Sequence, residues 1–162
     1  MDNTKKILLI GEGGVGKTSW LSRQTTGEYI KQYIANTSAE THTLNFNNTN
    51  FIFYDIAGQN RFGQNFQIYN DINIAFIMFD VTSRQTLKTL EYWIDIIKSI
   101  DDNIPIVILG NKIESQDALG NSVINRKIKL LQEKYNNIVN YIQISCKSNY
   151  NYDKPLEYAI NI

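Results

Sequence analysis

The chain has 162 residues, 43% of them hydrophobic, and equal numbers of acidic and basic residues, 16 of each. One domain of this length buries roughly 68–70% of its unfolded surface and needs no disulfide or structural metal; the single cysteine, Cys146, excludes a disulfide framework or a Cys/His zinc cluster and favours a reducing compartment. Zero net charge gives no support for direct nucleic-acid binding. No apolar segment suits a signal peptide or a membrane span. We expect a single domain over residues 1–162 that is located inside the cell, in the cytoplasm, the nucleus or both.

The first half of the chain predicts a strand, a helix and a hairpin. The β-branched run Lys6–Ile10 predicts a buried strand that stops at a glycine cluster, and a helix is expected from Gly16 to about Thr26. Two further strands are expected at Thr43–Asn47 and Asn50–Ile56. They flank Asn47-Asn48-Thr49-Asn50, which favours a hairpin turn, so the two strands are expected to be antiparallel.

In the second half, apolar runs alternate with helical patterns. The runs Ile74–Phe79, Ile106–Leu109 and Tyr141–Ile144 are typical of parallel strands covered on both faces. Helices are expected from Ser83, as the capping residue, to about Ile100, from about Asn121 to Tyr135, and from near Lys154, where Pro155 suits a first turn. The residues expected to face the core are Leu87, Leu90, Trp93, Ile94, Ile97, Val123, Ile124, Ile128 and Leu131. The alternation predicts a doubly wound α/β fold whose site lies beyond the carboxyl ends of the strands.

A phosphate-binding loop is predicted at Gly11–Thr18. The sequence Gly-Glu-Gly-Gly-Val-Gly-Lys-Thr matches G-x-x-x-x-G-K-[ST] between a predicted strand and a predicted helix, which is the context that gives the motif its meaning. Glycines let the backbone turn its N–H groups toward phosphates, and the helix N-terminus adds partial positive charge. Lys17 is expected to reach the β- and γ-phosphates and the Thr18 hydroxyl to bind Mg²⁺. The predicted nucleotide-binding residues here are Gly13, Gly14, Val15, Gly16, Lys17, Thr18 and Ser19.

A carboxylate stands at the end of the next parallel strand. Asp55 is followed by Ile56-Ala57-Gly58-Gln59 and is expected to lie beside the phosphate loop. One carboxylate, one hydroxyl, water and phosphate oxygens form the set that Mg²⁺ prefers, so Asp55 is expected to hold the metal through water. Gly58 is expected to approach the γ-phosphate and Gln59 to orient the attacking water, which makes Gln59 and Lys17 the catalytic candidates.

Two later strand ends complete the pattern. They run into Asn111-Lys112-Ile113-Glu114 and Ser145-Cys146-Lys147. With these segments the whole chain resembles the Ras-like small GTPases, whose N-K-x-D and S-A-K segments recognise guanine. The segments 77–84, 103–107 and 145–155 resemble the Ran branch most. The resemblance implies a three-layer P-loop NTPase fold with a mostly parallel six-stranded sheet and one antiparallel edge strand, and GTP or GDP with Mg²⁺ as the bound groups.

The resemblance also implies roles for individual residues. Asn111 would contact the base and link the loops, and the Lys112 stem would stack on the purine. Ser145 would support the site, the Cys146 main-chain N–H would meet the guanine carbonyl oxygen, and Lys147 completes the segment. A cysteine is acceptable in that place because the contact comes from the main chain.

Glu114 departs from the family pattern. The family has an aspartate there that accepts hydrogen bonds from the guanine ring N–H and the exocyclic amine. Glutamate keeps the charge but is one methylene longer, so the loop has to shift for both bonds to form. We expect guanine preference with weaker affinity, because a misplaced hydrogen bond to a charged group costs about 1.5–3 kcal/mol.

The segments that would sense the γ-phosphate carry two further departures. Ungapped alignment places Asn36 where the family has its sensing threonine, with Thr37 one residue later, and both stay open as metal ligands. In the second switch, Asn60 replaces a glutamate that helps exchange proteins eject nucleotide. The response to exchange proteins is therefore expected to differ.

The resemblance suggests protein partners. Gly13 and Gly14 leave space for an arginine supplied by an activating protein, which in Ras itself is worth about 10³–10⁵ in rate. Arg126, Lys127 and Lys129 lie on a predicted helix, either as a solvated face or as a contact for nuclear-transport receptors. The chain ends at Ile162 without the acidic tail of Ran-like proteins or a prenylation cysteine, so we expect no membrane anchor. We also expect a monomer.

Three functions are compatible with these features to different degrees. The first is a Ran-like GTPase switch that hydrolyses GTP slowly. The second is a degenerate relative, a decoy or scaffold with little hydrolysis, which the residues at 36, 60 and 114 motivate. The third, a small kinase that uses ATP, is disfavoured because a lid or an acceptor-binding insertion does not fit in this length.

Overall fold

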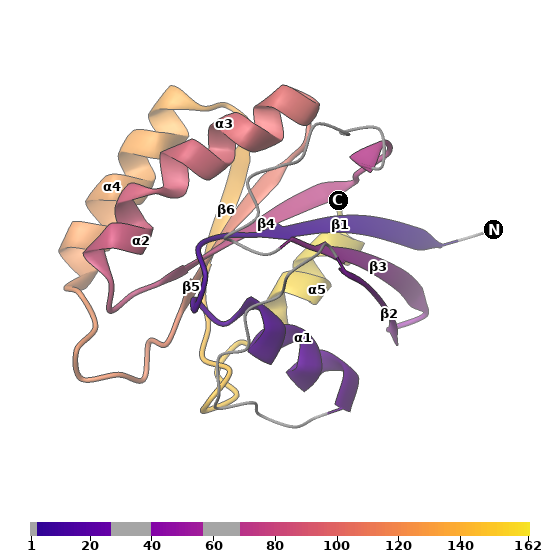
Figure 1. Cartoon of the computed structure of the whole chain (residues 1–162), viewed down its shortest axis with the longest axis horizontal. Helices are drawn as coiled ribbons and strands as arrows, with labels where there is room; N and C mark the ends of the chain where they lie inside the picture. The colour runs from indigo at the N-terminus through magenta and orange to yellow at the C-terminus, as the bar shows by residue number, and fades with distance from the viewer. Residues whose placement is uncertain (1–2, 27–39, 57–68) are drawn as a thin grey trace.

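The computed structural model describes residues 3–26, 40–56 and 69–162, which form a six-stranded sheet flanked by helices (Figure 1). The strands are β1 (Thr4–Ile10), β2 (Glu40–Phe46), β3 (Thr49–Asp55), β4 (Ile74–Asp80), β5 (Ile106–Asn111) and β6 (Ile138–Gln143). Their order across the sheet is β2-β3-β1-β4-β5-β6. β2 is antiparallel to β3, and the remaining pairs of the described sheet are parallel. The predicted α/β fold with one antiparallel edge strand is confirmed.

Helices cover both faces of the sheet, which makes three layers. They are α1 (Lys17–Thr26), α2 (Arg84–Lys88), α3 (Leu90–Ile100), α4 (Asn121–Lys134) and α5 (Lys154–Ile160). Figure 1 shows α2, α3 and α4 on one face and α1 and α5 on the other. Side chains alternate along a strand, and Ile77 and Phe79 of β4 pack in the α2–α4 core while Phe76 and Met78 pack in the α1–α5 core. β4 is therefore buried on both faces, as its continuous apolar run predicts.

The β2–β3 hairpin turns at two asparagines. Asn47 and Asn48 have φ values of 48° and 60°, so both adopt the left-handed conformation. Asparagine tolerates this conformation, and two consecutive left-handed residues match the twist of a two-residue hairpin. The predicted turn is confirmed, and the strands on either side extend from the register that this turn sets.

The helix predicted from Ser83 to Ile100 is divided into α2 and α3 at Thr89. The cap is as predicted, since the Thr86 N–H donates to Ser83 Oγ at 3.3 Å. The Thr89 hydroxyl donates to the Thr86 carbonyl at 3.2 Å. In a continuous helix that carbonyl accepts from the N–H of residue 90, so the threonine side chain competes with the helix at this point.

The predicted core is correct at all but one position. The five residues of α2 and α3 and three of α4, Ile124, Ile128 and Leu131, are buried. Val123 was predicted wrongly, because its exposed fraction is 39%. The buried residues of α4 are spaced by four and three positions, which defines a stripe that leaves Val123 to one side.

The last strand starts earlier than predicted. β6 covers Ile138–Gln143 in place of Tyr141–Ile144. It is the edge strand of the sheet, and most of its residues are half-buried or exposed, so no continuous apolar run marks its beginning. Helix α5 begins at Lys154 with Pro155 in its first turn, as predicted.

The parallel strands bring the predicted site together. Their carboxyl ends meet at one edge of the sheet, because Leu9 pairs with Asp55 and Asp80 pairs with Asn111 in register. The loop between β1 and α1 lies at the same edge. Among the described residues, no helix is both long and apolar enough to cross a membrane.

Candidate nucleotide-binding site

The loop from Gly11 to Gly16 depends on glycine at two close approaches. A Cβ on Gly11 would lie 2.2 Å from the Met78 carbonyl oxygen, and a Cβ on Gly16 would lie 2.3 Å from Asn111 Nδ2. Gly16 also has a φ of +108°, which L-residues with side chains rarely adopt. The glycines therefore allow strand β4 and the end of β5 to touch the loop directly.

Side chains from the end of β5 hold two successive carbonyls of this loop. Lys112 Nζ donates to the Gly14 carbonyl at 2.9 Å, and Asn111 Nδ2 donates to the Val15 carbonyl at 3.0 Å. A trans peptide is planar, so the N–H that follows each carbonyl points the opposite way. The N–H groups of Val15 and Gly16 are thereby turned away from β5, in the manner of an anion-binding nest.

Lys17 is buried at the start of α1 and has an exposed fraction of 6%. Its ammonium donates to the Gly11 carbonyl at 2.8 Å and the Glu12 carbonyl at 2.9 Å. Burial lowers the pKa of Lys17 to about 8, against the opposing effect of the negative charges of Asp55 and Glu12. A buried cation inside a loop of inward N–H groups is suited to bind an anion, because the negative charge of the anion compensates for the water that the ammonium loses on burial.

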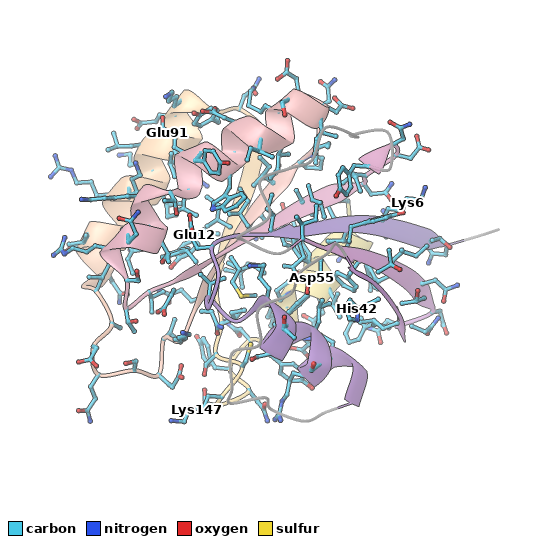
Figure 2. All side chains as sticks on the ribbon, in the orientation of Figure 1. Lys6, Glu12, His42, Asp55, Glu91 and Lys147 are labelled. Atoms are coloured by element: carbon cyan, nitrogen blue, oxygen red, sulfur yellow. The ribbon has the colours of Figure 1, made fainter. Side chains whose placement is uncertain are left out.

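Asp55 ends β3 and is completely buried. Figure 2 shows it between the ribbon of β1 and helix α1. The described residues contain no group of three or more His, Cys, Asp or Glu side chains that would enclose a metal. One buried carboxylate with the Thr18 hydroxyl on the first turn of α1 fits Mg²⁺, which needs few protein ligands and keeps several waters.

Asn111 links three segments, as predicted. Its exposed fraction is 3%, its Nδ2 reaches the Val15 carbonyl, and its Oδ1 accepts from the Cys146 N–H at 3.3 Å. The Cys146 N–H thus contacts Asn111 in this structure, and its contact with a guanine oxygen stays a prediction. The base-contacting roles of Asn111 and Lys112 also stay predictions.

The Ser145-Cys146-Lys147 segment forms a closed turn. The Ser145 N–H donates to the Tyr150 carbonyl at 2.9 Å, and the Ser148 N–H donates to Ser145 Oγ at 3.0 Å. Burial raises the pKa of the Cys146 thiol to about 12, and the negative charge of Glu114 adds to the rise. The thiol stays protonated at neutral pH, which leaves the main chain of Cys146 as the part that acts in binding.

Other predicted residues are placed as follows. Gly13, Gly14 and Ser19 are half-buried around the loop, whereas Glu114 and Lys147 are exposed on the base-binding segments. Asn36, Thr37, Gly58, Gln59 and Asn60 lie outside the described residues.

Two contacts of the site were missed by reasoning from the sequence. In the first, the Tyr152 carbonyl accepts from Trp20 Nε1 at 2.8 Å and from Gln24 Nε2 at 2.6 Å. Arg23 adds a hydrogen bond to Asn149, and its guanidinium carbon lies 5.9 Å from the centre of the Tyr152 ring. These contacts join α1, which follows the phosphate loop, to the loop that carries Ser145 and Cys146.

The second missed contact is an ion pair between Asp80 Oδ2 and Lys112 Nζ at 2.8 Å. Asp80 ends the apolar run of β4 beside the end of β5, and a charged residue at a strand's carboxyl end is the feature that would have indicated it.

A glycine-rich loop between a strand and a helix, with its carbonyls held and a buried lysine within it, defines a P-loop nucleotide-binding protein. The model of the Ras family matches residues 6–161. The chain belongs to the Ras family and is a small GTPase domain, a nucleotide-binding switch. Members of this family generally bind GTP or GDP with Mg²⁺, and they act with regulator proteins.

Proposed function

We propose that this chain is a Ran-like GTPase that binds Mg²⁺ with GTP or GDP, hydrolyses GTP slowly by itself, and acts as a switch. The observation that carries the nucleotide-binding part is the link through Asn111, whose buried amide joins the phosphate loop to the Cys146 main chain. The Ran-like part depends on the segments 77–84, 103–107 and 145–155.

Different residues of the chain are proposed to bind the phosphates, the metal ion and the attacking water. The loop N–H groups and Lys17 would meet the β- and γ-phosphates, and Asp55 and Thr18 would hold Mg²⁺, which would supply positive charge to the phosphates. Gln59 is proposed to orient the attacking water, and Asn36 or Thr37 to sense the γ-phosphate. A Cβ placed on Gly14 would meet no atom of the described residues within 4 Å, and we propose that an arginine from an activating protein approaches the loop at this point.

Guanine selectivity is proposed to depend on Glu114. Its carboxylate is exposed and close enough to Cys146 to raise the thiol pKa. It therefore lies near the segment whose main chain would meet the base. A carboxylate there accepts from guanine N–H groups, whereas adenine presents no matching pair of donors.

Transport receptors are proposed as partners of the α4 surface. Arg126 and Lys129 are exposed, while Lys127 lies 3.7 Å from Glu91 on α3. Two of the three basic residues are thus directed to solvent, and the third takes part in a surface ion pair of small energetic value. We propose that the domain is a monomer in the cytoplasm, the nucleus or both.

A scaffold with little hydrolysis is the alternative function. Among the residues that the structure describes, Glu114, which replaces the aspartate of the family pattern, favours this alternative. Two measurements decide between the functions. The nucleotide that copurifies with the protein is identified by chromatography, and single-turnover GTP hydrolysis is measured with and without a Ran-type activating protein. Bound GDP or GTP with stimulated hydrolysis supports the switch; nucleotide binding without hydrolysis under either condition supports the scaffold. Equal affinity for ATP and GTP in competition would contradict the guanine assignment.

A further inference from the structure

Asp80 lies at the carboxyl edge of the sheet, where the neighbouring strands β4 and β5 end. It is the last residue of β4 and pairs in register with Asn111 of β5. Its Oδ2 is 2.8 Å from Lys112 Nζ. The side chain of Asp80 is 12% exposed and that of Lys112 is 38% exposed, so water only partly screens the pair.

The carboxylate of Asp80 is held in one orientation by the turn that follows it. Oδ1 accepts from the Thr82 N–H at 2.8 Å and from the Thr82 hydroxyl at 2.7 Å. The Thr86 hydroxyl accepts from the Asp80 N–H at 3.0 Å. With Oδ1 occupied in this way, Oδ2 is directed at Lys112, and the acceptor is in place without rearrangement.

Lys112 is itself in an unusual conformation. Its φ is +70°, a left-handed value that a non-glycine residue keeps only where the surrounding structure holds it there. Its ammonium is shared between Asp80 Oδ2 and the Gly14 carbonyl, which lies 2.9 Å away. Lys112 therefore connects the base-binding segment to the phosphate loop, and its ammonium makes both contacts.

We propose that Asp80 is a positioning residue for nucleotide binding. Its carboxylate holds the Lys112 ammonium on the Gly14 carbonyl, which fixes the Lys112 stem and orients the following N–H of the phosphate loop. The inference rests on the proposed function, since it concerns the same nucleotide site. Removal of the charge leaves Lys112 with one fewer anchor, so nucleotide is released faster.

The test measures release of fluorescently labelled GDP in the presence of excess unlabelled GDP. Asp80→Asn is expected to speed release roughly tenfold, since a hydrogen bond that involves charged groups is lost or weakened. Lys112→Met keeps the stem and removes the ammonium. If Asp80 acts through Lys112, the double variant releases GDP no faster than Lys112→Met alone. A purely structural role of Asp80 would add its effect to that of Lys112→Met.

Two further variants serve as controls. Asp102→Asn removes a carboxylate 3.3 Å from Lys98, in a pair far from the site whose Asp102 side chain is 75% exposed, and is expected to leave release unchanged. Thr82→Val keeps the Asp80 charge but removes one hydrogen bond to it, with an expected increase of roughly two- to fivefold. Thr82→Val provides the answer if Asp80→Asn does not fold, which thermal unfolding of each variant establishes.

The outcomes separate the inference from the proposed function. Failure of the wild-type protein to bind any guanine nucleotide removes both. Normal binding with wild-type release rates in Asp80→Asn, or effects of Asp80→Asn and Lys112→Met that multiply in the double variant, overturns only the positioning role.

Discussion

Replacement of Gly16 by alanine tests how the phosphate loop is held. Gly16 has a φ of +108°, and its Cβ would lie 2.3 Å from Asn111 Nδ2. Gly14→Ala is the matched control, because Gly14 has a φ of +79° but an added Cβ meets no atom within 4 Å in the part of the chain that the structure describes. Both variants carry backbone strain of about 1–2 kcal/mol, whereas only Gly16→Ala displaces the Asn111 amide.

The additional cost in Gly16→Ala follows from the contacts of Asn111. The buried amide donates to the Val15 carbonyl and accepts from the Cys146 N–H, and an unmade buried hydrogen bond costs about 1–3 kcal/mol. We therefore expect the free energy of unfolding of Gly16→Ala to be about 2 kcal/mol lower than that of Gly14→Ala. For a domain of this size, that difference corresponds to roughly 4–8 °C in Tm.

The assay is thermal unfolding of the nucleotide-free variants, followed by titration with labelled GDP. Gly16→Ala is expected to lose nucleotide affinity far more than Gly14→Ala, because the link between the two binding segments is broken. Equal Tm values and equal affinities in the two variants would refute the reasoning, since strain alone would then account for both.

Three other predictions concern separate features. The pKa of Lys17 is lowered to about 8 from the ordinary value of 10.5, so as the pH rises the folded protein loses this proton before the unfolded chain does. The contribution of Lys17 to the free energy of unfolding therefore rises with pH between about 8 and 10.5 and is constant below pH 8. The measurement is the difference in unfolding free energy between wild type and Lys17→Met across this pH range. As the pH rises through 8, the affinity for phosphate-bearing nucleotide is expected to fall, as measured by calorimetry. The affinity for guanosine, which has no phosphate, is expected to change little. Trp20→Phe removes the donor to the Tyr152 carbonyl from a fully buried position, so we expect a loss of about 1–3 kcal/mol in urea unfolding and faster GDP release; unchanged release would contradict a link between α1 and the base-binding loop. Ile124→Ala is expected to cost about 2–5 kcal/mol, because Ile124 is 1% exposed, while Val123→Ala is expected to stay within about 0.5 kcal/mol; similar losses in both would contradict the position of Val123 outside the core stripe.

Local patterns in the sequence were enough to predict the features that depend on local geometry. The glycines of Gly11–Thr18 and the asparagines at 47 and 48 indicate their loops because few residues adopt those conformations. The continuous apolar run of β4 likewise reflects burial on both faces. For these elements the residue types themselves record the structural requirement.

Features that depend on the tertiary arrangement were not predicted. Trp20 and Tyr152 are separated by 132 positions and meet because α1 and α5 cover the same face of the sheet. Asp80 and Lys112 meet because β4 and β5 are neighbours in register. The early start of β6 was missed for a related reason, since a half-exposed edge strand has no continuous apolar run.

The two ends of the nucleotide site are not independent in this fold. Asn111 and Lys112 are consecutive residues at the end of β5, and they hold the consecutive carbonyls of Val15 and Gly14. The same two residues are the ones expected to meet the base. A movement of the β5 end therefore changes the base-binding segment and the phosphate cradle together. Asp80 and Cys146 fix that strand end from either side, through the Lys112 ammonium and the Asn111 amide, and so both act on the affinity for the whole nucleotide.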